Sequence, residues 1–463
     1  MDDFVSADQR VIDHHFLVVE NRGNIQAGRK ERIMSMGLIA LTLFAVFFAF
    51  LIVGVPIGFA LGLSGIIGLI FLDQPFMMFS QTLITGIDNF ALLSIPFFVL
   101  LGVVMERAKI SRSLVDLADE LVGFIRGGMA IVTVLASMFF ATVSGSGPAT
   151  VAAIGSITIP EMTKRGYSRR FAVGIASSAG ALGPIIPPSI PFIIYGVTTG
   201  ESIAKLFLGG MGAGLILGFL LMILSYVKAR REGVPVSGKR PSMKSAAKAT
   251  WHAKEALIAP IVVLGGIYAG LYTPTEAGAI GSIYVTGVGF YKRTLTIRSF
   301  CECIEKTAKI SAMIMFVLAT AYLLAWVMSA GQIPQVAANF ILEWANNKFL
   351  FFLFVNILFL FIGSVLDTPA AIVILAPILA PIAVKLGIDP IHFGTVVVVN
   401  FVIGYITPPF AINLFVAKGL TGMSMEECSI AIWPFIVVCI LGLILITAFP
   451  GISLFFPRLF MGT

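Results

Sequence analysis

Two short stretches combine hydroxyl groups, small residues and helix breakers inside otherwise apolar sequence. The first is Ser144-Gly145-Ser146-Gly147-Pro148-Ala149-Thr150, and the second spans residues 183–191. In lipid, a broken helix leaves backbone N–H and C=O groups unpaired unless protein or a polar cavity covers them. Transporters use such breaks near the bilayer midplane to coordinate ions and anionic groups. The alternative is a set of loop turns with a proline kink between packed helices.

Both stretches return later in the chain without a gap. Pro148-Ala149 recurs as Pro369-Ala370, a shift of 221 positions. At the same shift, the second stretch repeats its breakers: Gly183, Ile185, Pro187 and Pro188 map on Gly404, Ile406, Pro408 and Pro409. Composition bias supplies apolar matches but does not readily supply matching breakers in one register. The sequence therefore predicts an internal duplication of two half-transporters.

The breakers offer hydroxyls, carbonyls and helix ends, which suit sodium ions and a polar substrate. The predicted sodium-binding residues are Ser94, Ser144, Gly145, Ser146, Gly147, Thr150, Gly183, Pro187, Thr368, Gly404, Thr407 and Pro408. The predicted substrate-binding residues are Ser146, Ser178, Ser189, Asp367, Asn400 and Asn413, and Ser177 is a further candidate ligand. For any single hydroxyl, the alternative is a hydrogen bond back to its own helix.

Asp367 is the most informative single residue, because an ionisable group inside a membrane is a functional candidate by default. It occupies the position at which the first copy of the repeat has Ser146. Its carboxylate could balance sodium charge or contact a polar substrate. The alternative is a tip exposed to a water-filled vestibule, where the carboxylate only caps the following helix.

Composition places the chain in a lipid bilayer. Of 463 residues, 58% are hydrophobic and 12% are charged, whereas soluble chains carry about 25% charge. Many apolar runs reach the ~20 residues that cross a bilayer. The net charge of +7 does not indicate a nucleic-acid partner, because the lysines and arginines fall in short loops between spans. The four cysteines suggest no disulfide framework, and residues 1–33 lack the apolar centre of a signal peptide.

The predicted fold is an all-α polytopic membrane protein with two repeats. A polar extension (1–35) precedes the first repeat (36–228), and a basic cytoplasmic linker (229–255) leads to the second (256–463). The first repeat is expected to hold spans within 36–72, a loop at 73–89, a span at 91–105, an interfacial helix at 111–126, a re-entrant hairpin at 127–163, a broken helix at 171–199 and a span at 203–227. The second is expected to hold spans at 256–270 and 276–290, a loop at 291–309, a span at 310–328, an interfacial helix at 332–346, a hairpin at 349–385, a broken helix at 393–417 and a span at 430–456.

Five crossings and one hairpin in each half would invert the second half relative to the first, giving an inverted-topology repeat. With the N-terminus outside, the basic loops all lie inside, as the positive-inside rule requires; they span 106–126, 164–170, 228–254 and 291–309. The opposite loops, 73–89, 271–276 and 387–390, lack lysine and arginine. One cluster, Arg29-Lys30-Glu31-Arg32, would lie outside and opposes this orientation.

These residues resemble the large membrane subunit of tripartite ATP-independent periplasmic (TRAP) transporters, of the DctM or SiaM type. The motifs behind the resemblance are Ser144 to Thr150, residues 183–195, Tyr272-Thr273-Pro274-Thr275-Glu276-Ala277-Gly278, Asp367-Thr368-Pro369-Ala370 and Ile406-Thr407-Pro408-Pro409. The resemblance implies an elevator mechanism and sodium coupling with no organic cofactor. It also implies a small four-helix membrane subunit, expected here as a separate chain, and a periplasmic binding protein that delivers the substrate.

Family substrates are organic acids such as C4-dicarboxylates and sialic acids, and the resemblance places the chain in the bacterial inner membrane. A stand-alone sodium–carboxylate symporter would share the duplicated hairpins but would work without a binding protein. An intramembrane hydrolase is the remaining alternative. The chain has no His-Glu-x-x-His, Gly-x-Gly-Asp or Gly-x-Ser-x-Gly motif, and neither hairpin contains a histidine to serve as a general base. A nucleotide-driven pump would need a P-loop, which the sequence also lacks.

Overall fold

The computed structural model describes residues 37–108, 110–234, 242–345 and 347–462, and every regular element in these ranges is helical. The predicted extension at 1–35 and part of the linker, 235–241, lie outside the described residues. Five helices within the described ranges are long and apolar enough to cross a membrane: Phe90–Arg107, Ile203–Arg231, Ile297–Ala330, Thr368–Lys385 and Met425–Ala448. The all-helical class expected from the sequence is confirmed.

The first half begins with a helix at Gly37–Ile52, followed by a turn at Gly54-Val55-Pro56 that separates it from the next helix within the predicted spans of 36–72. Its further helices are α2 (Ile57–Phe71), α3 (Met77–Ile87), η1 (Phe90–Leu93), α4 (Ser94–Arg107), α5 (Ser111–Val122), α6 (Gly128–Ser144), α7 (Gly147–Thr150), η2 (Val151–Gly155), α8 (Ser156–Lys164), α9 (Arg169–Gly180), α10 (Ile190–Thr199) and α11 (Ile203–Arg231).

The second half starts after α12 (Met243–His252). Its helices are α13 (Lys254–Tyr268), α14 (Pro274–Tyr291), α15 (Ile297–Ala330), α16 (Ile333–Trp344), α17 (Lys348–Gly363), α18 (Thr368–Lys385), α19 (Pro390–Gly404), α20 (Ile412–Thr421), α21 (Met425–Ala448) and α22 (Gly451–Met461). Hairpin 1 is thus α6 with the helical limb 147–164, and hairpin 2 is α17 with α18. Each lies within one residue of the predicted bounds.

Three expectations about loops and spans were wrong. The loop at 73–89 is mostly the helix α3, an apolar segment that packs against α15. The loop at 291–309 is mostly the start of α15, because a capping box between Thr296 and Ser299 begins that helix before its charged residues. The expected last span divides into α21 and α22, because the chain leaves the helix at Phe449 before Pro450.

Helix caps follow the same shift of 221 positions as the breakers. Ser146 caps hairpin 1 where Asp367 caps hairpin 2, and Ser168 caps α9 where Asp389 caps α19. Both breaks also hold a cis proline bond, at Pro187–Pro188 and Pro408–Pro409. The two halves therefore build matching elements at matching positions. Their inverted orientation across the membrane stays a prediction.

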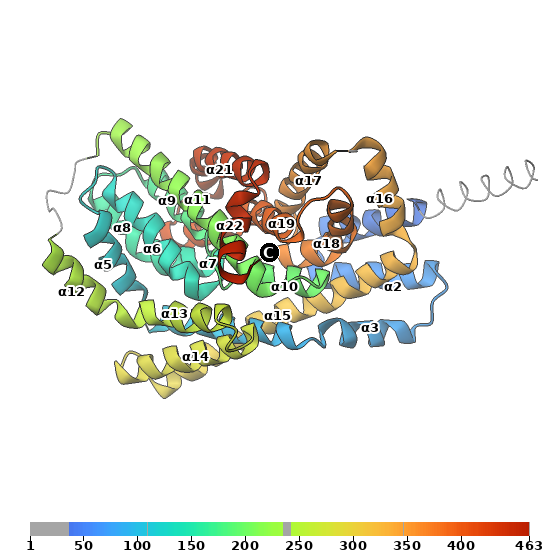
Figure 1. The fold of residues 1–463 in the computed structure, drawn as a ribbon, viewed down its shortest axis with the longest axis horizontal. Helices are drawn as coiled ribbons and strands as arrows, with labels where there is room; N and C mark the ends of the chain where they lie inside the picture. The colour runs from blue at the N-terminus through green and yellow to red at the C-terminus, as the bar shows by residue number, and fades with distance from the viewer. Residues whose placement is uncertain (1–36, 109, 235–241, 346, 463) are drawn as a thin grey trace, which may run out of the picture.

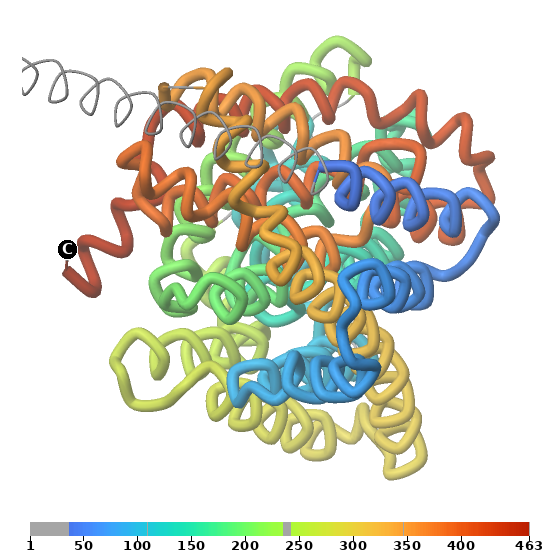
Figure 2. Tube along the Cα trace, turned by 90° about the vertical axis from the view of Figure 1, so that its right-hand side faces the viewer, coloured from blue at the N-terminus to red at the C-terminus, as the bar shows by residue number. Residues whose placement is uncertain are grey.

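The helices form two layers. A scaffold layer consists of α2, α3, α4, α13, α14 and α15, in which α15 packs on α2, α3 and α4, and α14 packs on α4 and α13. A hairpin layer consists of α6 to α11 and α17 to α22. Figure 1 shows α3, α13, α14 and α15 along one side of the molecule, and Figure 2 shows lighter-blue and yellow segments below the green and red ones, whereas the dark-blue first helix lies level with the red ones. The amphipathic helices α5 and α16 each contact both layers.

Small residues bring the scaffold helices together. Along α2, a stripe of glycines faces α15, so that a Cβ on Gly58, Gly62, Gly65 or Gly68 would press on Phe316, Thr320, Leu323 or Val327 respectively. Membrane helices commonly associate through such small-residue stripes, because lipid supplies no hydrophobic drive and close packing must. The stripe explains how α2 can lie directly against a helix as bulky as α15.

We predict that Gly68→Ala destabilises the scaffold layer. The added methyl would overlap the Val327 Cγ1 and touch Leu43, both buried, and the β-branched valine has little rotamer freedom with which to yield. Overpacking of this kind costs about 1–3 kcal/mol. Thermal unfolding of the purified protein in detergent should show a lower midpoint.

Gly287→Ala on α14 is the matched control, because a Cβ there would meet nothing within 4 Å. It should leave the unfolding midpoint unchanged or slightly higher. Equal midpoints for Gly68→Ala and the control would contradict the close α2–α15 contact.

Candidate functional site

The tip of hairpin 1 is built by a left-handed glycine and a helix cap. Helix α6 ends at Ser144, and Gly145 turns the chain with a φ of 58°, a conformation that glycine adopts without steric cost. Ser146 then caps the second limb by accepting a hydrogen bond from the Ala149 N–H at 3.5 Å. A Cβ on Gly145 would lie 2.8 Å from the Pro188 carbonyl oxygen. The tip therefore touches the first break directly.

A cluster of uncharged oxygen atoms lies behind this tip. The Ser144 Oγ is 3.0 Å from the Thr150 Oγ1, which donates to the Ser146 carbonyl at 2.8 Å. Gly183 closes the cluster, since a Cβ there would lie 2.6 Å from the Ser146 carbonyl oxygen and 2.8 Å from the Thr150 Oγ1. Four predicted sodium-binding residues thus meet in one place, from both sides of the break.

The tip of hairpin 2 shares the helix cap, supplied here by Asp367, but turns without a left-handed glycine at residues 363–367. The Asp367 Oδ1 accepts a hydrogen bond from the Thr368 N–H at 3.0 Å and caps α18. Behind it, the Ser364 carbonyl accepts from the Phe410 N–H in the second break, and Gly404 packs on the Gly363 carbonyl. Capping was the alternative role considered for Asp367, and the carboxylate does cap. The hydrogen bond to the Thr368 N–H uses the Oδ1 atom, and no ion pair of Asp367 occurs among the described residues.

The second limb of each broken helix crosses to the hairpin of the other repeat. Helix α10 packs on α18, and α20 packs on α7, η2 and α9. At the start of α20, the Asn413 Nδ2 donates to the Ser177 carbonyl at 3.0 Å. The buried Asn413 Oδ1 and Ser177 Oγ have no hydrogen-bond partner among the described residues, and the Asn413 Oδ1 would be 2.8 Å from a Cβ on Gly147. This crossing places further oxygen ligands beside hairpin 1.

A cavity of about 290 Å³ separates the two hairpin tips from the scaffold layer. The hairpin side comprises residues 144–149, Asp367, Pro369 and residues from both breaks. The scaffold side comes from α4 and α15. The lining residues are Val99, Gly102, Val103, Ser144, Gly145, Ser146, Gly147, Pro148, Ala149, Pro184, Ile190, Pro191, Ile310, Met313, Ile314, Asp367, Pro369, Tyr405 and Ile412.

Four helix N-termini converge on this cavity. The lining includes the first turns of the hairpin 1 limb, α10 and α18, each of which carries a proline at its first or second position, and the first residue of α20. Proline suits these positions because their N–H groups have no partner inside the helix. Helix N-termini carry partial positive charge and exposed N–H groups, and they bind anions. The cavity therefore favours a small anion without any basic side chain.

The formal charge of the cavity wall is negative. Its lining residues, all within the described ranges, include one carboxylate, the half-buried Asp367, and neither lysine, arginine nor histidine. Among the ion pairs of the described residues, none involves Asp367. A cation that accompanies the anion would neutralise this wall.

The remaining predicted residues lie outside the cavity lining. Several hydroxyls hydrogen-bond back to carbonyls of their own segment: Ser94 to Ala91, Ser178 to Gly174, Ser189 to Pro184 and Thr407 to Ile403. Asn400 belongs to a separate network, in which its Nδ2 donates to the Asn356 Oδ1 at 2.8 Å. Pro187 and Pro408 shape the breaks, Gly404 packs against α17, and the buried Thr368 Oγ1 has no partner among the described atoms. Their predicted ligand roles stay predictions.

Sequence reasoning missed Tyr405 and the whole scaffold wall. Tyr405 lies inside the second break, between Gly404 and Thr407, so its position beside predicted ligands was a usable signal. Val99, Gly102 and Val103 of α4, and Ile310, Met313 and Ile314 of α15, carry no such signal. They are ordinary apolar residues of membrane helices, and only the packing of the two layers brings them to the cavity.

Comparison with known proteins identifies relatives over most of the chain. Residues 44–452 match the family "Tripartite ATP-independent periplasmic transporter, DctM component". The chain is 43% identical over 416 residues to the isethionate TRAP transporter permease protein DctMQ of Oleidesulfovibrio alaskensis, covering 89% of this chain and 66% of that relative. The C4-dicarboxylate TRAP transporter large permease protein DctM of Pseudomonas aeruginosa is 42% identical over 86% of this chain and 94% of its own length. The sialic acid TRAP transporter large permease protein SiaM of Vibrio cholerae is 34% identical over 89% and 97%.

Solved structures support the fold at lower sequence similarity. The YdaH transporter of Alcanivorax borkumensis aligns with a TM-score of 0.59 and 17% identity, covering 80% of this chain and 87% of that one. MtrF of Neisseria gonorrhoeae aligns with a TM-score of 0.56 and 13% identity, covering 80% and 83%. The helical architecture is therefore one that other membrane transporters share.

The paired hairpins, their broken partner helices and the family match agree with one another and exclude the hydrolase alternative. The chain is a multi-pass membrane protein, and it belongs to the family of TRAP transporter large permease subunits.

Proposed function

We propose that this protein is the permease subunit of a sodium-coupled importer of a small organic anion. The observation that carries the proposal is the cavity between the hairpin tips, which combines four helix N-termini with a single unpaired carboxylate and no basic side chain. The helix ends attract the carboxylate or sulfonate of an organic acid. The Asp367 charge opposes that anion unless cations bind with it, which couples the two.

The oxygen atoms around the tips support sodium as that cation. Behind the tip of hairpin 1, the Thr150 Oγ1 lies within hydrogen-bond distance of both the Ser144 Oγ and the Ser146 carbonyl oxygen. Asn413 and Ser177 add buried oxygens without partners in the described part of the chain. Buried polar atoms are rarely left unsatisfied, and transporters use such hydroxyls and unwound carbonyls to coordinate sodium. These residues would hold the ion, whose chemical contribution is charge neutralisation of the site.

The two-layer arrangement supports an elevator movement. All hydrogen-bonding groups of the cavity belong to the hairpin layer, whereas α4 and α15 contribute only apolar side chains and glycine to its wall. A wall without polar partners lets the hairpin layer slide past it at little cost. The helices α5 and α16, which contact both layers, would join the moving part to the fixed part.

The family membership supports three-component assembly in the bacterial inner membrane. The expected partners are a small membrane subunit and a periplasmic binding protein that hands over the substrate. Relatives are named for C4-dicarboxylates, sialic acid and isethionate, so the substrate class we propose is a small organic acid. A stand-alone symporter would use the same cavity but would need no binding protein.

Reconstitution tests the proposed function. Proteoliposomes with the permease and its small subunit would be assayed for uptake of radiolabelled succinate, N-acetylneuraminate and isethionate, each with its purified binding protein. Uptake should require both the binding protein and external sodium. Uptake that persists when potassium replaces sodium and a proton gradient is kept would contradict sodium coupling, and uptake without the binding protein would favour the symporter.

Asp367→Asn should abolish most uptake while leaving insertion and subunit binding intact. The change preserves shape and a capping oxygen but removes the charge that sodium or substrate is proposed to balance. Hydrogen bonds to charged groups contribute roughly 1.5–3 kcal/mol, so the rate should fall about tenfold or more. The readout is initial uptake at equal membrane abundance. Ser146→Ala, at the repeat-related position, should act more mildly, and near-normal uptake by Asp367→Asn would leave the carboxylate with capping alone.

Thr150→Val should raise the sodium concentration for half-maximal uptake. The substitution keeps the side-chain volume but deletes the hydroxyl that joins Ser144 and the Ser146 carbonyl. One neutral ligand contributes about 1 kcal/mol to ion binding, so its loss should raise the sodium concentration for half-maximal uptake about fivefold. Sodium titrations of uptake measure it.

The control for this substitution is Thr158→Val on the same hairpin. Thr158 is equally buried, but its hydroxyl bonds only to the Ile154 carbonyl of its own limb. Its sodium dependence should match the wild type. The same shift in both variants would mean that loss of any buried hydroxyl perturbs the hairpin, and that Thr150 has no specific role toward the ion.

A further inference from the structure

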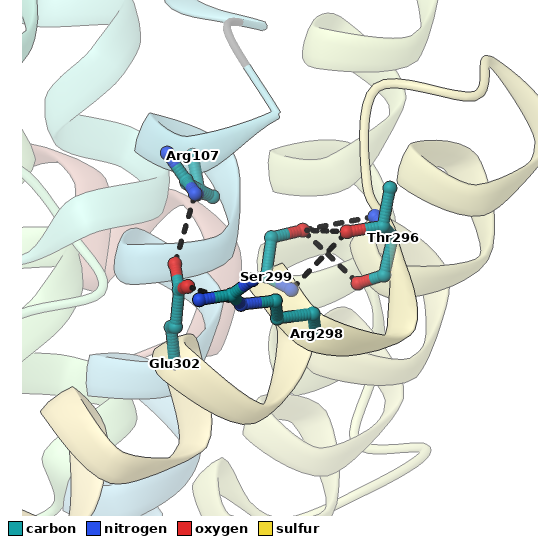
Figure 3. Close-up of polar contacts among 5 residues, drawn as sticks. All are labelled: Arg107, Thr296, Arg298, Ser299 and Glu302. Atoms are coloured by element: carbon teal, nitrogen blue, oxygen red, sulfur yellow. Dashed lines mark hydrogen bonds and ion pairs between the residues drawn. The ribbon is translucent and has the colours of Figure 1, made fainter.

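A second cavity, of about 370 Å³, lies between α4 and α15 and has a different character from the first. It is lined by Val103, Glu106, Arg107, Glu302, Cys303 and Lys306. Its charged residues form cross-helix ion pairs. The Arg107 guanidinium lies 2.9 Å from Glu302, and the Lys306 ammonium lies 3.0 Å from Glu106. Figure 3 shows Arg107 and Arg298 on either side of the Glu302 carboxylate, with the capped start of α15 beside them.

The two cavities are adjacent parts of one groove. Val103 lines both. On α4, the lining residues Val99, Gly102, Val103, Glu106 and Arg107 recur every three or four positions, and on α15 the same spacing joins Glu302, Cys303, Lys306, Ile310, Met313 and Ile314. Such spacing keeps residues on one face of a helix. At 1.5 Å per residue, Lys306 lies about 6 Å along α15 from Ile310 of the first cavity.

The groove therefore changes from apolar to charged in one direction. Its charged end comprises the C-terminus of α4 and the first turns of α15, both in segments that the positive-inside rule places in the cytoplasm. An anion that leaves the hairpin tips past Val103 would next meet Arg107 and Lys306. Bulk cytoplasm lies beyond these side chains, which are about half exposed, at 54% and 53%.

The ion pairs at this end are suited to exchange. Exposed salt bridges contribute about 0–1 kcal/mol, so a passing carboxylate or sulfonate can replace Glu302 or Glu106 at little cost. Because each cation has its own carboxylate, that carboxylate can reclaim the cation and release the anion. Two unpaired cations would instead trap the anion.

We propose that this cavity is the release vestibule of the permease, in which Arg107 and Lys306 exchange Glu302 and Glu106 for the acid group of the departing organic anion. The inference rests on the proposed function of the first cavity and extends it to the exit path. The alternative is a static bracket, in which the same ion pairs only fasten α4 to α15.

The release vestibule and the static bracket predict different signs for the effects of substituting Arg107 and Glu302 on the half-saturating anion concentration inside the proteoliposomes. In a vestibule, Arg107→Gln removes a site for the anion, whereas Glu302→Gln leaves Arg107 free to hold it. In a bracket, both changes break the Arg107–Glu302 pair, and Glu302→Gln also removes the longer contact with Arg298, so both effects have the same sign. The assay uses proteoliposomes that contain the permease and its small subunit. They are preloaded with the labelled anion that the wild type carries, among succinate, N-acetylneuraminate and isethionate, and unliganded binding protein outside accepts it.

The measured quantities are the half-saturating anion concentration inside and the half-saturating concentration of liganded binding protein outside. Arg107→Gln and Lys306→Gln should raise the internal value about threefold to fivefold, as expected for one exposed charge contact. Glu302→Gln should lower it, and Arg107→Lys should resemble the wild type. All four should leave the external value unchanged. Lys309→Gln is the matched control, because its exposed pair with Glu305 on α15 lines neither cavity.

Each outcome decides one question. Opposite internal shifts for Arg107→Gln and Glu302→Gln support the vestibule. Shifts of equal sign, or an internal value that does not move, overturn it and leave the bracket. If wild-type protein carries none of the three anions, the proposed function itself fails, and that result is distinct from failure of the vestibule.

Discussion

The structure depends on how backbone groups at broken helices are satisfied away from water. An interrupted helix in lipid needs polar partners for its freed N–H and C=O groups. Here each break is covered by the tip of a hairpin: Gly145 approaches the Pro188 carbonyl, and the Ser364 carbonyl accepts from Phe410. The second limbs then cross between the repeats, so neither half completes its site alone. Because the breaks are brought together in this way, four helix N-termini surround one cavity, and these N-termini are the basis of the proposed anion site.

The difference in polarity between the hairpin layer and the scaffold layer follows from that arrangement. The polar groups are concentrated in the hairpin layer, and the scaffold presents an apolar wall over the cavity. Glycines on α2 allow α15 to pack closely and form a rigid support. The apolar part of this contact can shift without breaking hydrogen bonds, whereas the hydrogen bond of 3.2 Å between Thr198 of α10 and Tyr322 of α15 would have to break. The charged end of the α4–α15 groove is the exception, and its exposed ion pairs can re-form at small cost.

Much of the fold was predictable, because its determinants are local. Breakers in a repeated register located both hairpins within one residue, and the amphipathic pattern of 111–126 located α5. The wrong predictions concern segments that were assigned from their hydrophobicity or charge alone, without considering the residues that cap their helices. Thr296 and Ser299 start α15 within the segment predicted as a basic loop. The segment 73–89, predicted as a loop, forms the helix α3 over most of its length. The site was predictable on the hairpin side alone. Nothing in the sequence marks Val103 or Ile314 as cavity residues, since tertiary packing alone brings them there.

The central claim is that an organic anion binds between the hairpin tips, at the helix N-termini that surround Asp367. Cryo-electron microscopy of the permease with its small subunit, in sodium and a saturating concentration of the transported anion, tests this claim most directly. The account predicts density for the acid group beside residues 146–149 and for a bound cation near Ser144 and Thr150. Anion density at the Asn356–Asn400 network instead, with the cavity between the tips empty, would contradict it.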